Sequence, residues 1–239
     1  MTGSGAHGGG RRTMGTHPPD GRPSAVDRVV ATVRSGVRDG RFAPGQRLVE
    51  ADLMRELGIG RNTLREALSR LSSDGLVTIA PHRGASVRRL TRTEVEQLYE
   101  LREVLEGLAA RLAALHINTP GHRDRLLAAL DAVQETARTA EMPQYIDENL
   151  RFHRTVVEMS GHTRLLELVD QLQLQTFRVQ FRSAAAHDRT GMRGFSVSEH
   201  QSLAEAILAG DAEQAENIMR THLRHTGSSI LQLPDSDFA

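Results

Sequence analysis

The segment from Pro44 to Val87 constrains the fold of this chain more than any other. Two short amphipathic stretches flank Gly58, and apolar residues recur in both at the three-to-four spacing of a helix face. This face consists of Leu53, Leu57, Leu64, Ala67, Leu68 and Leu71. Beyond an Asp74-Gly75 turn, apolar residues alternate from Leu76 to Ile79 and from Ala85 to Val87. The pattern predicts two helices joined by a tight turn and followed by a two-stranded wing.

The polar face of the second helix carries side chains that suit nucleic acid. Arg61, Asn62, Thr63 and Arg65 stand at its start, and these residue types reach phosphates and purine edges in the major groove. The wing loop, Pro81-His82-Arg83-Gly84, forms a basic tip. For any single arginine, a position on a solvated helix face is the simpler interpretation. The charge distribution of the whole chain distinguishes this interpretation from DNA binding.

Charge is divided unevenly along the chain. Residues 1 to 92 contain 16 arginines against 8 acidic residues, whereas residues 93 to 239 contain 14 arginines against 22. The net charge of zero therefore combines about +8 with about −8. A basic N-terminal part suits a polyanion, and DNA binding predicts a slope of about −0.9 in log affinity against log salt for each phosphate neutralised.

The same segment closely resembles the winged helix-turn-helix of the GntR family of bacterial transcription regulators. Residues 44 to 76 follow the family pattern PG.RL.E..L...LG..R..LREAL..L...GL at nearly every fixed position. The resemblance, which covers roughly residues 24 to 90, implies DNA contacts by the four residues at the start of the second helix and by His82 and Gly84 at the wing. Two positions depart from the pattern. Gly60 replaces the usual Ser or Thr cap, and Ala51 stands where some members place a base-reading arginine.

Length and composition indicate two domains. A chain of 239 residues can form one small and one medium domain, and the absence of cysteine excludes disulfides and thiolate metal sites. Residues 1 to 22 are rich in glycine and lack a hydrophobic core segment, so we expect a disordered tail and not a signal peptide. No apolar run could span a membrane, and a cytoplasmic location is expected. The expected domains are 23–90 and 93–232.

The second half predicts an all-helical bundle, so the expected fold is mainly α. About six helices are expected, near 93–116, 122–140, 143–160, 162–186, 196–209 and 211–231. Helix starts are expected at Thr93 with Glu96, Ser196 with Glu199, and Asp211 with Gln214. The apolar stripes of these helices are interpreted as core. They include Leu101, Leu105, Leu108, Leu112, Leu126, Leu130, Val133, Leu165, Leu168 and Leu172.

Three histidines on three expected helices stand on apolar faces. Asn149 and His153 are one turn apart, His200 lies among apolar residues, and His222 shares a face with Ile218. They could converge in the bundle. A lone histidine on such a face is more often a hydrogen-bonded core residue than a ligand.

These residues resemble the signatures of the FCD domain, the helical effector-binding module of the FadR-type branch of the GntR family. The matching segments are NLRFH at 149–153, EHQSLAEAI at 199–207 and MRTHL at 219–223. The resemblance implies that His153, His200 and His222 hold a divalent metal against which small carboxylates bind. Asn149 replaces the usual Asp ligand, so the site keeps more positive charge. Zn, Ni, Co and Mn all suit such nitrogen-rich sites. His225, one turn beyond His222, is the alternative ligand.

A cation facing the same cavity would pair with a carboxylate effector. Arg102 is the first candidate, in a segment that resembles the R..LE element of the first FCD helix, and a surface pair with Glu106 is the alternative. Arg178 and Arg182 are further candidates, because the helix that carries them lines the pocket in similar proteins.

Taken together, the sequence predicts a DNA-binding transcriptional regulator and not an enzyme. We expect a homodimer that binds an inverted-repeat operator. It is expected to act as a repressor whose DNA binding is controlled by a small organic acid. Two alternatives stay open. One is a metal enzyme built on the three histidines, although no catalytic acid or base accompanies them, and the other is an architectural DNA-binding protein with a metal-free bundle.

Overall fold

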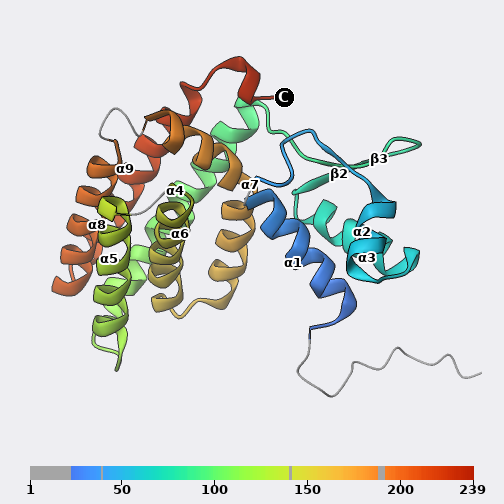
Figure 1. The fold of residues 1–239 in the computed structure, drawn as a ribbon. Coiled ribbons are helices and arrows are strands. Elements are labelled where there is room, and N and C mark those ends of the chain that lie inside the picture. Colours follow the sequence, from blue (N-terminus) through green and yellow to red (C-terminus); the bar gives the residue numbers. More distant parts are fainter. Residues whose placement is uncertain (1–22, 39, 140–141, 188–191) are drawn as a thin grey trace, which may run out of the picture.

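A computed structural model describes the backbone of residues 23–38, 40–139, 142–187 and 192–239. Within these ranges the side chains of 38, 142–143, 177–187 and 192–195 are not described. The described elements, labelled as in Figure 1, are α1 (Ala25–Arg38), β1 (Arg47–Leu48), α2 (Glu50–Leu57), α3 (Arg61–Ser73), β2 (Val77–Ala80), β3 (Gly84–Val87), α4 (Arg92–Leu115), α5 (His122–Thr139), α6 (Met142–Met159), α7 (Thr163–His187), α8 (Met192–Ala209), α9 (Ala212–Leu231) and a 3-10 turn, η2 (Asp235–Asp237).

The first part of the chain, residues 25–87, forms a unit that we call the winged module. Helices α1 to α3 pack with a three-stranded antiparallel sheet of order β1-β3-β2. The apolar face predicted for α2 and α3 is buried, except that Leu57 is only partly so. The sequence pattern did not indicate β1. Its two residues pair with Ser86 and Ala85 of β3, and such a short strand has no periodicity of its own.

The wing is a tight hairpin between β2 and β3. The amide of Arg83 donates to the carbonyl of Ala80 at 3.1 Å, which closes the turn. His82 has a φ of +61° and Gly84 a φ of +78°, both in the left-handed region. Glycine adopts this region freely, whereas a histidine there is uncommon. The hairpin therefore presents His82 and Arg83 at an exposed, sharply turned tip.

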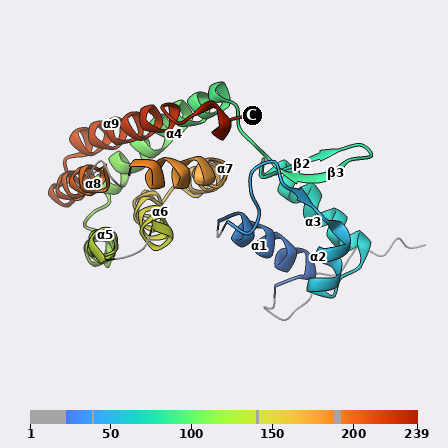
Figure 2. The same ribbon diagram turned by 45° about the horizontal axis from the view of Figure 1, so that its top comes forward.

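Helices α4 to α9 form the second unit, which we call the helical bundle. Both views show α4 and α9 side by side along one face of the bundle, with α5, α6, α7 and α8 packed on the other side (Figures 1 and 2). The six helices agree with the predicted ranges to within one or two residues, except that α8 begins at Met192 and not near residue 196. A large core of mostly aliphatic and aromatic residues joins α4, α5, α6, α8 and α9, and the described part of α7 contributes Leu165 and Val169 to a smaller cluster.

Two of the three predicted helix starts were wrong. Thr91, and not Thr93, caps α4, because its side chain accepts from the amide of Glu94 while Glu94 accepts from the amide of Thr91. Ser196 lies inside α8, which begins four residues earlier at Met192. The third start is confirmed, since Asp211 accepts from the amide of Gln214 at 3.0 Å.

The prediction that all the apolar stripes are core was also partly wrong. Leu126, Leu130, Val133 and Leu165 are buried, but Leu101, Leu108 and Leu168 are exposed. Periodicity identifies an apolar face without identifying what covers it. On α4 the inner face consists largely of small residues against α9, and Leu101, Leu108 and Leu115 point outward.

The two units meet along α7 and at the end of the chain. Leu174 packs against the core of the winged module, and α1 contacts α7. Beyond α9, the amide of Ala239 donates to the carbonyl of Leu90 at 2.9 Å, so the last residues lie against the connection between the units. A cleft of about 780 Å³ lies between α1 and α3 on one side and α6 and α7 on the other. None of the helices in the described part of the chain combines the length and apolar character needed to cross a membrane.

Candidate functional site

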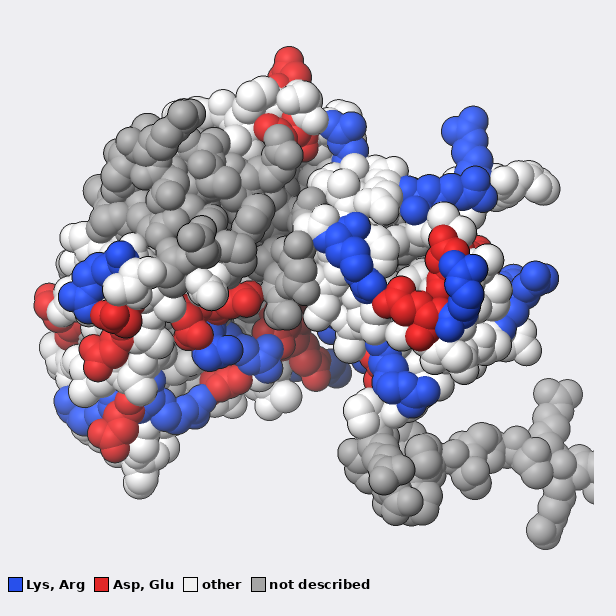
Figure 3. Space-filling view, viewed as in Figure 1, with Lys and Arg blue, Asp and Glu red and all other residues white. Residues whose placement is uncertain are grey.

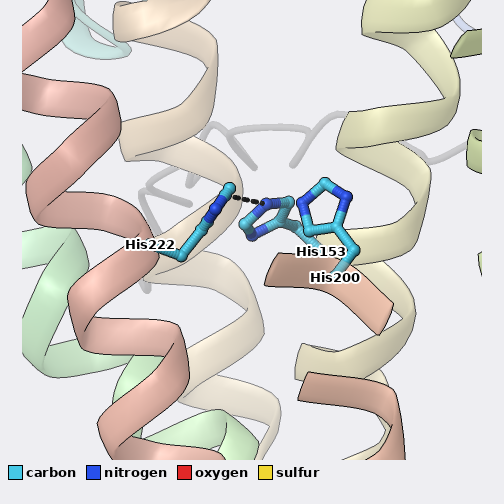
Figure 4. A group of neighbouring side chains, drawn as sticks. All are labelled: His153, His200 and His222. Carbon is cyan, nitrogen blue, oxygen red and sulfur yellow. Dashed lines mark hydrogen bonds between the residues drawn. The ribbon is translucent and has the colours of Figure 1, made fainter. Parts of the chain in front are cut away.

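The three predicted histidines converge in the bundle. His153 on α6, His200 on α8 and His222 on α9 are all buried, and a ring nitrogen of each lies within 4.8 Å of the others (Figure 4). Their ring centroids are 4.7 to 5.3 Å apart. Phe152 packs against His200 with centroids 4.6 Å apart. Helices distant in the sequence thus bring three imidazoles to one point.

Two carboxylates orient two of these rings. Glu106 on α4 accepts from Nδ1 of His153 at 2.8 Å, and Glu199 on α8 accepts from Nδ1 of His222 at 2.7 Å. Burial alone raises the pKa of Glu106, but the charge of Arg102 and the hydrogen bond from His153 outweigh it and lower the pKa to about 2. Burial likewise raises the pKa of Glu199, and the bond from His222 outweighs it to give a lowered pKa. Both acids are therefore ionised acceptors, and both Nδ1 atoms carry the proton.

This protonation leaves Nε2 of His153 and of His222 with lone pairs that face each other. The two atoms are 3.2 Å apart. Two nitrogens each about 2.1 Å from one ion are about 3.4 Å apart at the tetrahedral angle and about 3.0 Å apart at a right angle. His200 is fully buried, and neither ring nitrogen has a hydrogen-bond partner among the described residues. Burial lowers the pKa of His200 well below its usual value, so this ring is neutral.

The residues present therefore fit a divalent metal ion. Three neutral imidazoles would supply nitrogen ligands, and the carboxylates behind two of them are the outer partners that metal-bound histidines typically have. Asn149 lies one turn before His153 on α6 and is half-buried, and its part as a fourth ligand stays a prediction. His225 is not in the cluster. It is half-exposed and pairs with the second oxygen of Glu199 at 2.7 Å.

Arg102 lies close to this cluster, fully buried. Its Nε donates to Glu106 at 2.7 Å, its Nη1 donates to Thr176 on α7 at 3.2 Å, and its guanidinium lies 4.9 Å from the ring centroid of Tyr99. The pair with Glu106, which the sequence offered as an alternative on the surface, exists but is buried. The side chains of Arg178 and Arg182 lie outside those that the structure describes.

Most of the residues predicted to contact DNA are exposed on the winged module. Arg61, Asn62 and Arg65 project from the first turns of α3, while Thr63 is half-buried. Gly60 is the N-cap of α3 and supplies no side chain to the first amides of the helix, in keeping with the departure seen in the sequence. Those amides are free to meet a phosphate.

The arginines of this region differ from others on the same module. Arg34, Arg41, Arg55 and Arg70 each pair with an acidic residue. Within the described part of the chain no ion pair engages Arg61, Arg65 or Arg83. Figure 3 shows positive side chains at the outer edge of the winged module, whereas both signs intermingle over the visible face of the bundle.

Sequence reasoning did not identify the two orienting carboxylates. Glu106 follows Arg102 at i+4 and was considered only as its surface partner. Glu199 precedes His200, so its side chain leaves α8 about 100° further around the helix. That direction leads to His222 on another helix, which a single-helix argument could not reveal.

Comparison with protein families matches both units. The model of the FCD domain matches residues 97–225, and the model described as bacterial regulatory proteins, gntR family, matches residues 25–87. Among solved structures, a GntR transcriptional regulator from Rhodococcus sp. RHA1 is similar, with a TM-score of 0.75 and 27% sequence identity over 87% of this chain and 98% of that one. The matched ranges coincide with the winged module and with most of the bundle.

Curated proteins similar to this chain are also described as transcriptional regulators. A probable D-xylose utilization operon transcriptional repressor from Paenarthrobacter nicotinovorans is 28% identical over 80% of this chain and 86% of its own length. An HTH-type transcriptional regulator from Agrobacterium vitis is 33% identical over 56% of this chain and 81% of its own. These relatives are regulators and not enzymes. The chain therefore belongs to the GntR family of bacterial transcription regulators, in the branch whose helical part is an FCD domain.

Proposed function

We propose that this regulator is a repressor that binds an inverted-repeat operator through its winged module and releases it when a small organic acid binds in a metal-containing bundle. The observation that carries the proposal is the convergence of three buried imidazoles. Similarity to the Paenarthrobacter repressor supports the sign of the regulation. Two separate apolar cores support a division into two domains, proposed at 23–90 and 93–232, and the core of the bundle also takes in Leu90, Leu233 and Phe238.

The metal site in this proposal consists of His153, His200 and His222, with Asn149 as a fourth ligand. A bound divalent ion supplies a positive charge and coordination positions that attract a carboxylate. Because the side chains proposed to bind the ion are neutral, they do not cancel its positive charge. The identity of the ion, Zn, Ni, Co or Mn, follows ligand preference and availability.

Arg102 is the protein cation proposed to contact the effector, together with Arg178 and Arg182 on α7. Its guanidinium already donates to Glu106 and Thr176, so an effector carboxylate would have to share it with Glu106. The metal is therefore the main attraction for the acid, and Arg102 contributes orientation. A coupling of about 1 to 3 kcal/mol between effector and operator binding would be typical of such a switch.

A homodimer would arise through the outer face of α4. Leu101, Val104, Leu108 and Leu115 are 39 to 59% exposed, and their spacing is that of a coiled-coil seam. A second copy in antiparallel orientation could place Val104 of each chain beside Leu108 of the other, a reciprocal contact that two-fold symmetry permits. A two-fold protein then matches a two-fold operator.

Operator binding can be tested at the unpaired arginines. A duplex selected from random-sequence DNA by the wild-type protein serves as the probe. We expect Arg61→Ala and Arg65→Ala each to weaken binding about tenfold or more, because a lost base or phosphate contact costs about 1 to 3 kcal/mol. Fluorescence anisotropy at several salt concentrations measures this, and each lost phosphate contact lowers the salt slope by about 0.9.

Arg164→Ala is the matched control, since Arg164 is an exposed arginine of the bundle paired with Glu167. It should bind the duplex as the wild type does. Unchanged affinity in both α3 variants would contradict the assigned DNA face.

Gel shifts with zinc and a panel of sugar acids, hydroxy acids and dicarboxylates test whether an organic acid controls DNA binding. Release by none of them would contradict control by an organic acid.

A further inference from the structure

A buried chain of hydrogen bonds leads from the histidine cluster to α7. Glu106 lies at its centre, where one oxygen accepts from His153 at 2.8 Å and from Nε2 of Gln173 at 3.4 Å. The other oxygen accepts from Arg102, which in turn donates to Thr176. All five side chains are at most 7% exposed. One carboxylate therefore connects an imidazole of the cluster to two residues of α7.

The next residues of α7 face the other way. Gln173 and Thr176 are three positions apart and point into the bundle, whereas Leu174 and Gln175 between them face the winged module. Leu174 packs against the core of that module. Gln175 lies against Gly75, where a Cβ would be only 2.8 Å from its side-chain carbon, and Gly75 has a φ of +73°. Because Gly75 has no side chain, the amide end of Gln175 lies directly against the turn between α3 and β2, and a shift of α7 would reach that turn through it.

Residues 173–176 of α7, which we call the connecting segment, contact both units. Figures 1 and 2 show α7 at the side of the bundle that faces α1. Gln173 and Leu174 also line the cleft between the units. A one-turn segment with opposite faces in two cores can transmit a small displacement, because packed interfaces switch between discrete arrangements and do not deform continuously.

We propose that Glu106 is a positioning residue that couples the histidine cluster to the winged module through residues 173–176. The inference rests on the proposed metal site. An ion at Nε2 of His153 polarises the ring and strengthens its Nδ1 bond to Glu106, so less of the carboxylate charge is available to Arg102 and Gln173. In a dry interior such changes are felt strongly at neighbouring hydrogen bonds. Arg102, Thr176 and Gln173 then readjust, and α7 moves against Gly75.

Hydrogen exchange of the full-length protein with and without zinc tests this coupling. The amides of Gly75 and Leu76 donate to Ser72 and Leu71, each at 3.0 Å, so their exchange rates report opening of the turn. We expect zinc alone to change these rates at least fivefold in the wild type. Gln175→Ala should reduce the change to less than twofold while zinc affinity, measured by competition with a chelating dye, stays within threefold of the wild type.

Two further variants probe the inner side of the chain. Thr176→Val removes the bond from Arg102 with almost no change in shape and should also abolish the response at Gly75. Glu106→Gln should weaken zinc binding about 10- to 100-fold, the usual effect of losing an outer partner of a metal-bound histidine. If Glu106→Gln does not fold, the other two variants still decide the matter. Gln171→Ala, an exposed glutamine on the same helix, is the matched control and should respond as the wild type does.

The possible failures are distinguishable. Zinc binding without any change at Gly75 in the wild type, or with an undiminished change in Gln175→Ala, would overturn the coupling and leave the metal site intact. A wild-type protein that binds no zinc, nickel, cobalt or manganese would overturn the metal site and the coupling with it. Loss of the response in Gln175→Ala and Thr176→Val, but not in Gln171→Ala, supports the coupling.

Discussion

At the scale of single residues, His200 is a buried side chain whose polar atoms reduce the stability of the bundle. Its ring is fully buried, and both of its nitrogens lack a hydrogen-bond partner among the described residues. A buried polar group without a partner costs about 1 to 3 kcal/mol. His153 and His222 avoid this cost at Nδ1 by donating to Glu106 and Glu199. The arrangement favours an ion over a simple apolar core.

Replacing His200 by leucine should therefore have opposite effects with and without metal. In the presence of a chelator, the free energy of unfolding of His200→Leu should be about 1 to 3 kcal/mol higher than that of the wild type, because the two buried nitrogens without partners are removed. In excess zinc the wild type should instead be the more stable of the two proteins, because only the wild type gains the binding energy of the ion. Urea denaturation under both conditions measures this. The exposed His116, changed to leucine, should keep the response to zinc, and equal zinc stabilisation of wild type and His200→Leu would argue against the metal site.

At the scale of the helix, the start of α4 is decided by contacts outside the helix. Both Thr91 with Glu94 and Thr93 with Glu96 have the spacing of a capping box. The guanidinium of Arg92 donates to the carbonyls of Leu231 and Leu233 and pairs with Asp235 at 2.7 Å. These bonds hold the first residue of α4 against the end of α9, so the cap falls on Thr91.

The two threonines provide a matched pair for a stability test. Thr91→Ala should cost about 1 kcal/mol because an amide of the first turn loses its acceptor. Thr93→Ala should be neutral or slightly stabilising, since alanine is the better helix former.

The hydrogen bond from the Thr91 amide makes the largest contribution to lowering the pKa of Glu94 below its ordinary value of 4.5. The stabilisation by Glu94 is thus complete above pH 4.5 and disappears as the pH falls through the lower folded-state pKa. Urea unfolding at pH 7 and pH 3 measures both effects, and equal losses in the two variants would contradict the observed cap.

At the scale of the whole molecule, the unpartnered seam on α4 and the uneven charge are linked. The seam lies on the bundle, which carries the acidic part of the chain, while Arg61, Arg65 and Arg83, which form no ion pair with the described residues, lie on the winged module. Two copies joined through α4 would present two basic modules to one duplex. Binding two half-sites together strengthens affinity without any new contact, because the second module binds at a high effective concentration.

Leu108→Arg should therefore yield a monomer and weaken operator binding at least tenfold. The charge cannot be buried at the centre of an apolar two-fold interface. Sedimentation velocity and DNA titration measure the two effects together. Leu127→Arg is the control, because Leu127 on α5 is similarly exposed but lies outside the seam. A Leu108→Arg protein that stays dimeric would place the interface elsewhere.

Much of this protein could be predicted from local patterns. The helix of Arg61 and Arg65, the wing tip at His82 and the six bundle helices are all encoded in short windows, because periodicity, glycine turns and charge act within a few residues. The three histidines were also recognisable, each from its own apolar helix face. These features do not depend on knowing which segments meet.

Other features were decided only by the tertiary structure. Whether Leu108 is core or surface, whether Arg102 is exposed or buried, and which histidine Glu199 holds all depend on neighbours supplied by distant segments of the chain. The burial of Arg102 and Glu106 arises because α6 and α7 cover that part of α4 and add His153 and Thr176 as partners. A sequence shows which side chains can form a bond, but only packing brings together groups that are 47 or 74 residues apart and removes the water that would otherwise replace them.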